Sequence, residues 1–438
     1  MKKRAHVVTT AFVGLISAAL AVSPARSQGV PPAPPPLGEE PAIEVAPGVP
    51  DVMRREGLGQ TEARAVLDRQ GAIARFLNDS GITRRDDFVD LIVRPKPYQI
   101  ILSFERDVKI SDVIALVPPN LRSFVKVRKA KQSKAQRLST MESLRQVLSA
   151  ADGTPFAIGH DPDAEVYFID TADSAGTAAL QALVPANLRR DVVFYTGALP
   201  REQVNRNAVP TGVRSGDWAA AGWGTYTTGT DQPCTLAYPV TFNSGLQGIL
   251  TASHCTEPKY VPRGTHNYTF PDVYYESPLT GNYDFAIYRT DGLTTDYRLY
   301  YSNPRSTPGY GSEGWLSVKN FIRRSASWVG MYACKSGSQT GITCGKIQSL
   351  NYDWRRNGSV FVRMTSDRLI SNQGDSGAPV FVTLDSSSPS AITAAGIHAG
   401  GWGETTQNGV YISVYMPIDR IFENFSSTVT NVRLKTAP

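Results

Sequence analysis

Ser376 is the clearest candidate for a reactive side chain in this sequence. It stands in the segment NQGDSGAPVF, residues 372–381, directly after Asp375 and between two glycines. A serine becomes a nucleophile only when a base takes its proton, a carboxylate orients that base, and donors stabilise the oxyanion. Glycine, aspartate and serine also form ordinary turns. The segment alone therefore leaves a simple turn residue as the alternative.

His254 is the candidate base. It follows an apolar run in GILTASHCTE, residues 248–257, where Cys255 could fix its backbone through a disulfide. Such fixed placement matters, because a displacement of about 1 Å can cost much of a reaction rate. A lone histidine here would otherwise be interpreted as structural.

Asp284 is the candidate orienter of that base. It precedes the apolar residues of NYDFAIYR, residues 282–289, and would accept a hydrogen bond from the second imidazole N–H. Taken alone, this aspartate could equally be a turn residue.

The N-terminal residues indicate export. Residues 1–27 combine a charged start, an apolar stretch at 7–22 and the small-residue site ARS, which together are typical of a signal peptide. We therefore expect a secreted protein, extracellular or periplasmic, with an uncleaved N-terminal anchor as the alternative. No later apolar run reaches the roughly 20 residues of a membrane helix, so no membrane contact is expected after signal removal.

Charge does not point to nucleic acid. The net charge of +6 includes four basic residues of the expected signal peptide, and no basic stripe remains elsewhere. We therefore expect no nucleic-acid partner.

The 438 residues divide by composition into a linker and two larger regions. Residues 28–50 are rich in proline and favour an extended linker. Residues 51–210 have helical spacing at 61–79 and 137–153. Residues 211–438 alternate short apolar runs with turn signals, which predicts an all-β domain, closed by one helix near 416–425.

The region 51–210 contains an internal repeat. QIILSF (99–104) followed by ALVPPNLRSFVKV (115–127) recurs as VYFIDT (166–171) followed by ALVPANLRRDVVF (182–194). Each copy predicts a strand, a short helix, a turn at Pro-x-Asn and another strand. Two α/β units, at about 51–130 and 131–200, are therefore expected.

Four cysteines, all after residue 230, favour two disulfides in an exported chain. Pairing of nearest neighbours closes short loops, Cys234 with Cys255 and Cys334 with Cys344. A metal site is the alternative; it is disfavoured because the sequence has no C-x-x-C pair.

The segments TASHC, YDFAIYR and GDSGAPV resemble the three catalytic blocks of chymotrypsin-fold serine peptidases, in the same chain order. CKSGSQTGITCG, residues 334–345, resembles the second disulfide loop of the streptogrisin and α-lytic protease group. The region before residue 200 occupies the position of that group's pro-region. The resemblance covers most of the chain from about 214 to 425.

The resemblance implies a fold and a mechanism. The fold would be mainly β, with two antiparallel β-barrels (chymotrypsin-like), the first ending at about 305, preceded by the α+β pro-region. Ser376 would attack a peptide carbonyl, His254 would carry the proton, Asp284 would hold the imidazole, and the N–H groups of Gly374 and Ser376 would form the oxyanion hole. We expect a monomeric serine endopeptidase, made as a zymogen, that acts on proteins or peptides and binds its own pro-region, without metal or cofactor.

The sequence departs from the related peptidases at three places. Gly377–Ala378 replaces the more common Gly-Gly; no cysteines flank Ser376; and Ala399 stands where related peptidases often carry a serine whose hydroxyl helps hold the aspartate.

The substrate-binding strand is expected to include His398, Ala399, Gly400 and Gly401. Near Ile370, the expected base of the pocket, no carboxylate occurs, which disfavours cleavage after Lys or Arg. GIHAGG resembles the strand of glutamyl endopeptidases in which a histidine faces a glutamate side chain. A protonated His398 would then favour cleavage after Glu, and this preference would shrink as the pH rises. An apolar pocket is the alternative for specificity, and a catalytically silent binding protein on the same fold is the alternative for function.

Overall fold

The structure, a computed structural model of the chain, describes residues 45–151, 153–200, 218–221, 224–227, 234–255, 259–263, 266–269, 273–277, 283–290, 294–302, 313–354, 361–402, 406, 409–426 and 432–437. The expected signal peptide and most of the proline-rich linker lie outside the described residues. Where the structure describes the chain, no helix is both long and apolar enough to cross a membrane.

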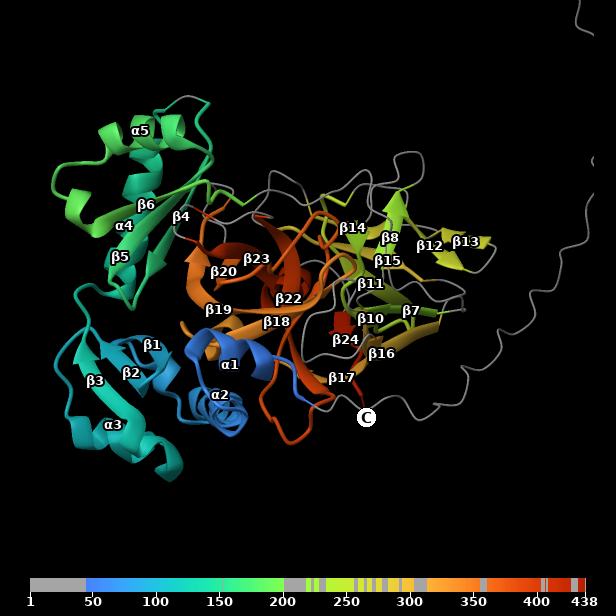
Figure 1. Cartoon of the computed structure of the whole chain (residues 1–438), viewed down its shortest axis with the longest axis horizontal. Helices are drawn as coiled ribbons and strands as arrows, with labels where there is room; N and C mark the ends of the chain where they lie inside the picture. Colours follow the sequence, from blue (N-terminus) through green and yellow to red (C-terminus); the bar gives the residue numbers. More distant parts are fainter. Residues whose placement is uncertain are drawn as a thin grey trace, which may run out of the picture. The chain divides into compact units, whose positions relative to one another are not determined.

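Two α+β units form the N-terminal region, drawn in blue to green in Figure 1. Helices α1 (Val49–Glu56) and α2 (Gln60–Asp79) precede the first three-stranded sheet. The first unit continues with η1 (Ile82–Arg84), β1 (Phe88–Pro95), β2 (Tyr98–Phe104), α3 (Ile110–Leu116), η2 (Pro119–Phe124) and β3 (Val125–Lys129). The second unit comprises α4 (Lys134–Leu148), β4 (Phe156–Asp161), β5 (Val166–Thr171), α5 (Ser174–Leu183), η3 (Arg189–Asp191) and β6 (Val192–Thr196).

The two units have the same topology. In each sheet the first two strands pair antiparallel, and the third strand returns parallel to the second after a helical crossover. The repeated QIILSF and VYFIDT segments lie in β2 and β5, the central strands. The repeated ALVP-x-NLR segments span the end of α3 or α5 and the following 3₁₀ turn.

Local signals explain where the helices begin. Ser133 caps α4, because its hydroxyl accepts from Gln136 N at 3.0 Å while Gln136 Oε1 accepts from Ser133 N at 2.8 Å. Asp173 caps α5 by accepting from Gly176 N at 2.7 Å. Helix α1 begins at Val49 with Pro50 in its first turn, so the helix starts before the expected end of the linker at residue 50.

The remainder of the chain is built of strands with one α-helix among its described residues. The strands are β7 (Trp218–Ala221), β8 (Gly224–Thr227), β9 (Cys234–Thr235), β10 (Pro239–Phe242), β11 (Gln247–Thr251), β12 (Lys259–Arg263), β13 (His266–Thr269), β14 (Val273–Glu276), β15 (Ala286–Arg289), β16 (Thr294–Ser302), β17 (Glu313–Phe321), β18 (Tyr332–Gly337), β19 (Gly341–Tyr352), β20 (Phe361–Ser366), β21 (Pro379–Val382), β22 (Ala391–Trp402), β23 (Tyr411–Pro417) and β24 (Val432–Leu434). A 3₁₀ turn η4 (Arg324–Ala326) follows β17, and helix α6 (Ile418–Ser426) lies near the expected position.

The second half of this region contains a closed barrel. Its strands pair in the order β18, β19, β20, β23, β22 and β21, and β21 pairs again with β18. The described strands of the first half form a five-stranded sheet (β14, β15, β11, β10, β24) and a four-stranded sheet (β13, β12, β8, β9). The mainly β prediction is therefore confirmed.

All pairings around the closed barrel are antiparallel, as the sequence predicted, but two pairings outside this barrel are parallel. β17 runs parallel to β22, and β16 runs parallel to β7. Parallel neighbours need a long connection, and about 70 residues separate β17 from β22 along the chain. β16 and β17 thereby extend the sheet of the closed barrel.

One apolar core joins the two halves of the β region. Leu250 of β11 and Ile287 of β15 are buried in the same cluster as Val318 of β17 and Val414 of β23. A second cluster joins β18–β20 to the first N-terminal unit, for example Met331 and Met364 with Ile73 of α2.

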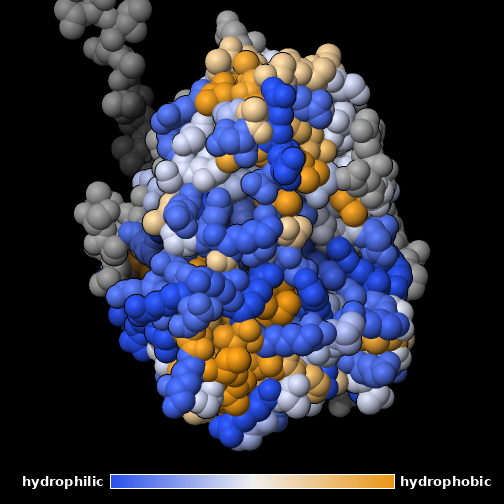
Figure 2. Space-filling model, turned by 90° about the vertical axis from the view of Figure 1, so that its left-hand side faces the viewer, coloured by the Kyte–Doolittle hydropathy of each residue, from blue (hydrophilic) through white to orange (hydrophobic). Residues whose placement is uncertain are grey.

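Most exposed large apolar side chains among the described residues belong to the N-terminal units. They are Ile110 and Leu116 of α3, Leu138 of α4 and Val193 of β6, together with Leu246 of the β region. Figure 2 shows apolar patches within a largely hydrophilic face, seen from the side on which Figure 1 draws α3, α4 and α5.

A buried ion pair connects the second unit to the barrel. One edge of the Arg363 guanidinium group in β20 donates two hydrogen bonds to Asp170 in β5, from Nε at 2.9 Å and from Nη2 at 3.1 Å. Tyr352 donates to the same carboxylate at 2.6 Å, and neither charged side chain is more than 1% exposed. Beside it, Ile158 of β4 and Asp353 exchange two backbone hydrogen bonds.

Replacing Asp170 by alanine should destabilise the chain by about 3–5 kcal/mol, because Arg363 would keep its charge in a buried site without its partner. The measurement is urea unfolding of the whole chain carrying Ser376→Ala, which removes the candidate nucleophile. The matched control is Asp163→Ala, which breaks an ion pair with Arg94 whose side chains are 35% and 47% exposed; it should cost about 1 kcal/mol or less. Equal losses in both variants would contradict a structural role for the buried pair.

Candidate active site

The three residues singled out in the sequence lie in one hydrogen-bonded chain. Nε2 of His254 lies 2.7 Å from Ser376 Oγ, and Nδ1 of His254 lies 2.8 Å from Asp284 Oδ2. All three residues are buried, Asp284 and Ser376 completely. Residues separated by 122 positions are thus placed within the reach needed for proton transfer.

His254 is held by the end of β11 and by a disulfide. It follows β11 by three residues, and Cys255 is bonded to Cys234 at the start of β9. The second disulfide joins Cys334 and Cys344, opposite partners in the β18–β19 hairpin. Both pairs are those that nearest-neighbour pairing predicts.

The loop around Ser376 requires glycine at two positions. Gly374 has φ 98° and Gly377 has φ 85°, in the left-handed region that favours glycine. A Cβ at Gly377 would lie 2.2 Å from the carbonyl oxygen of Thr235. The loop can therefore lie directly against β9 only because residue 377 has no side chain.

The same loop is fastened to β9 by hydrogen bonds. Thr235 N donates to Ser376 O at 2.7 Å, and Thr235 Oγ1 donates to Gly374 O at 2.8 Å. Ser338, at the tip of the β18–β19 hairpin, donates to the same Gly374 carbonyl at 3.0 Å. Both halves of the β region thus fix the peptides on either side of Asp375.

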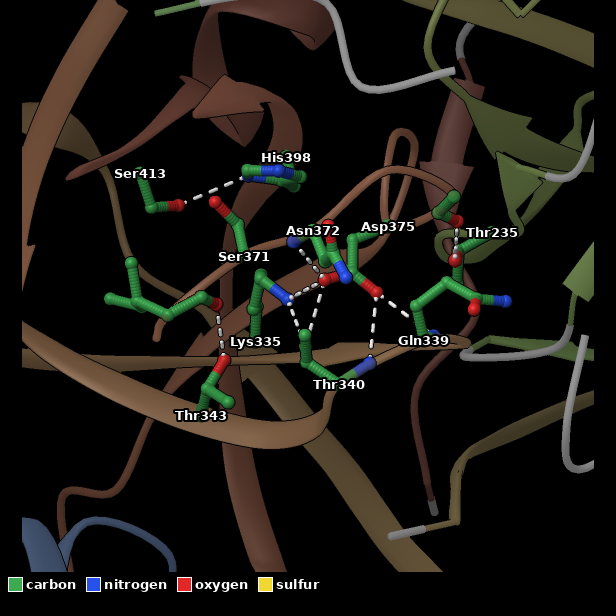
Figure 3. A network of polar contacts seen from close by, with 12 residues as sticks. Thr235, Lys335, Gln339, Thr340, Thr343, Ser371, Asn372, Asp375, His398 and Ser413 are labelled. Atoms are coloured by element: carbon green, nitrogen blue, oxygen red, sulfur yellow. Dashed lines mark hydrogen bonds and ion pairs between the residues drawn. The ribbon is translucent and has the colours of Figure 1, made fainter. Parts of the chain in front are cut away.

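A buried lysine neutralises the aspartate beside the candidate nucleophile. Lys335 Nζ of β18 lies 2.7 Å from Asp375 Oδ2, and both side chains are fully buried. Thr340 Oγ1 donates to Asp375 Oδ2 at 2.7 Å, and Gln339 N donates to Oδ1 at 2.9 Å. Figure 3 shows these groups converging on the Asp375 carboxylate.

The electrostatic balance of this pair follows from its burial. Burial disfavours the charge of Asp375, but the Lys335 ammonium and the hydrogen bonds from Lys335 and Thr340 together lower the pKa of the carboxyl group below its ordinary value. Burial lowers the pKa of Lys335, and the Asp375 charge opposes that shift. The sequence analysis did not identify Lys335. The one feature of the sequence that could have indicated its burial is its position among the small and apolar residues that follow Cys334.

His398 lies in β22 and is completely buried. Its Nδ1 lies 3.0 Å from Ser413 Oγ of β23, as Figure 3 shows. Burial, with a smaller contribution from the Lys335 charge, lowers the pKa of His398 to about 3. The lowered pKa favours a neutral imidazole in the protein without substrate, in contrast to the protonated His398 that the sequence predicted.

Ile370, the expected base of the pocket, and its neighbour Ser371 lie in different surroundings. Ile370 is buried in the core, where its Cδ1 would lie 2.6 Å from a Cβ at Gly345. Ser371 Oγ instead lies against β22, only 2.1 Å from where a Cβ at Gly401 would be. Figure 3 shows the Ser371 hydroxyl directed toward the side on which His398 and Ser413 lie.

The other residues expected in the substrate-binding strand also belong to β22. Ala399 is completely buried in the core that joins the two halves, and the register of β22 against β23 shifts between His398 and Gly400. Gly401 lies opposite Ser413. The structure therefore brings His398 and Gly401 to the Ser371 side and places Ala399 in the core.

Curated relatives of the chain are bacterial proteases. It is 28% identical to streptogrisin-A of Streptomyces griseus over 215 residues, which are 48% of this chain and 60% of that protein. It is 28% identical to streptogrisin-C of the same organism over 272 residues, which are 60% of this chain and 51% of that protein. The chain thus spans between half and two thirds of the length of these relatives, which confirm the resemblance to the streptogrisin group. No family model matches.

Solved structures add a more distant likeness. The Nocardiopsis protease NAPase matches half of this chain and the whole of its own, with 22% identity and a TM-score of 0.36.

Replacing Lys335 by methionine should reduce kcat/KM at least about 100-fold, because Asp375 would lose its counter-charge and the loop would shift on the scale of 1 Å. Peptide hydrolysis and thermal unfolding of the variant provide the measurement. Lys319→Met, at an exposed position of the same domain, removes the same charge and serves as the control. Full activity in Lys335→Met would show that the ion pair does not maintain the loop.

Proposed function

We propose that this chain is a serine endopeptidase that hydrolyses peptide bonds through Ser376, His254 and Asp284. The observation that carries the proposal is the buried chain of contacts from Asp284 through His254 to Ser376, at 2.8 and 2.7 Å. The similarity to the streptogrisins supports it. A silent binding protein would have no need for all three groups in this geometry.

In the proposed mechanism, Ser376 Oγ attacks the carbonyl carbon of the scissile bond while His254 Nε2 takes its proton. The N–H groups of Gly374 and Ser376 stabilise the oxyanion that forms. His254 then gives the proton to the leaving amine, and water, activated in the same way, hydrolyses the acyl-enzyme. Asp284 stays ionised and stabilises the imidazolium throughout.

The N-terminal region would act as a pro-region in a secreted zymogen. Its two α+β units contact the barrel through the Asp170–Arg363 pair and through Gln70 of α2, whose Oε1 accepts from Tyr332 N at 2.6 Å. Barrels rich in non-local contacts fold slowly, so a bound region of this kind can assist folding. The signal-like residues 1–27 support export.

For the substrate, we favour cleavage after Glu. If the Ser413 hydroxyl donates to Nδ1 of His398, the imidazole carries its proton on Nε2, and this neutral N–H can donate to a carboxylate. Ser371 offers a second hydroxyl on the same side of β22. An apolar pocket remains the alternative. A comparison of kcat/KM for matched Glu and Gln peptides distinguishes the two kinds of pocket.

Ser376→Ala should lower peptide hydrolysis by several orders of magnitude, because only binding and the oxyanion donors would remain. The measurement is turnover of peptide substrates by purified wild type and variant, with thermal unfolding to verify that both fold. Near-normal turnover in the variant, with contaminating protease excluded, would refute the proposed function.

Wild-type enzyme should cleave Glu peptides with a kcat/KM roughly 10- to 150-fold above that for matched Gln peptides, since a charge-assisted hydrogen bond contributes about 1.5–3 kcal/mol. Because kcat/KM reports the free enzyme, in which the pKa of His398 is about 3, this ratio should stay constant between about pH 6 and about pH 8. His398→Ala should abolish the ratio while cleavage after Leu is retained.

Two results would contradict this specificity. A Glu/Gln ratio near one, together with faster cleavage after Phe or Leu, would establish the apolar pocket. A ratio that falls steeply across that pH range would show that His398 loses a proton there.

A further inference from the structure

Asp284 is held by more than the imidazole that it orients. Its Oδ2 faces His254 Nδ1, whereas its Oδ1 accepts from Ser253 N at 2.9 Å, from Ser253 Oγ at 2.9 Å and from His254 N at 3.3 Å. Ser253 is 1% exposed and Asp284 is completely buried. One residue, Ser253, therefore supplies two donors to the oxygen that does not face the base.

The hydroxyl of Ser253 restricts the rotation of the Asp284 carboxylate more than the two backbone N–H donors would alone. A carboxylate can turn about its Cβ–Cγ bond, and only one orientation of its plane places an oxygen against Nδ1 of His254. A buried carboxylate also needs several donors to remain charged. The Ser253 hydroxyl serves both needs, because it donates to Oδ1 from a rigid position between β11 and the disulfide at Cys255.

The chain has no serine at the position where one was expected to perform this task. The sequence places Ala399 there, and the structure buries its methyl group in the core. Alanine offers no hydroxyl, so any side-chain donor that replaces it must come from another element. Ser253, from the first half of the β region, is such a donor.

We infer that Ser253 is a positioning residue of the catalytic machinery, and that its hydroxyl holds the Asp284 carboxylate in the orientation that His254 requires. This inference rests on the proposed peptidase function. It predicts that loss of the hydroxyl slows the chemical step and leaves substrate binding unchanged, because Ser253 contacts Asp284 rather than the expected substrate pocket.

The test compares three variants of the mature enzyme. Ser253→Ala removes the hydroxyl, Ser253→Cys keeps a group of similar size that donates weakly, and Ser253→Thr keeps the hydroxyl. Ser349→Ala, which removes an equally buried hydroxyl from β19, controls for general destabilisation. For each variant, kcat and KM for a peptide substrate and the rate of inactivation by a fluorophosphonate are measured beside thermal unfolding.

Ser253→Ala and Ser253→Cys should lower kcat roughly 10-fold, equivalent to about 1.4 kcal/mol at the transition state, with KM changed less than about twofold. The fluorophosphonate rate should fall in parallel, because that reaction uses the same base without the peptide-binding pocket. Ser253→Thr and Ser349→Ala should retain kcat within about threefold of wild type.

Equal kcat in Ser253→Cys, Ser253→Thr and wild type would overturn the inference, and it would do so even if Ser253→Ala failed to fold. A loss confined to thermal stability, with kcat unchanged, would also overturn it and leave Ser253 a structural residue. Failure of the proposed function itself would look different, because wild type would then hydrolyse peptides no faster than Ser376→Ala.

Discussion

The buried ion pair between Lys335 and Asp375 is the constraint on which the site depends. A charged aspartate directly before the candidate nucleophile cannot remain in a dry interior without a partner. Lys335 supplies that partner from β18, and the turn that follows adds Thr340 Oγ1 and Gln339 N. The conformation of the loop that carries Ser376 therefore depends on a hairpin about 40 residues earlier in the chain, which the disulfide Cys334–Cys344 closes.

The same loop is also fixed from the opposite side. Thr235 of β9 donates to both Gly374 O and Ser376 O, and the absence of a side chain at Gly377 permits this contact. Because β9 carries Cys234, the disulfide that steadies His254 also steadies the strand against which the loop packs. The base and the nucleophile are thus positioned by one connected framework, and a change on either side of it should affect both.

The residues that could be predicted from sequence are those that lie within a recognisable local motif. TASHC, YDFAIYR and GDSGAPV identify His254, Asp284 and Ser376, and the repeated ALVP-x-NLR locates two similar units. Lys335 and Ser253 could not be found in this way, because their partners are distant in sequence and a lone lysine or serine usually faces solvent. The pKa of His398 depends on the complete burial of this side chain, which no spacing of residues reveals.

The most direct measurement is to label the mature protein with a fluorophosphonate and to locate the adduct by tandem mass spectrometry. The account predicts a single adduct on Ser376 and none after His254→Ala, since the attack needs the base 2.7 Å from the hydroxyl. An adduct on another serine, or an enzyme that hydrolyses peptides without reacting at Ser376, would contradict the account.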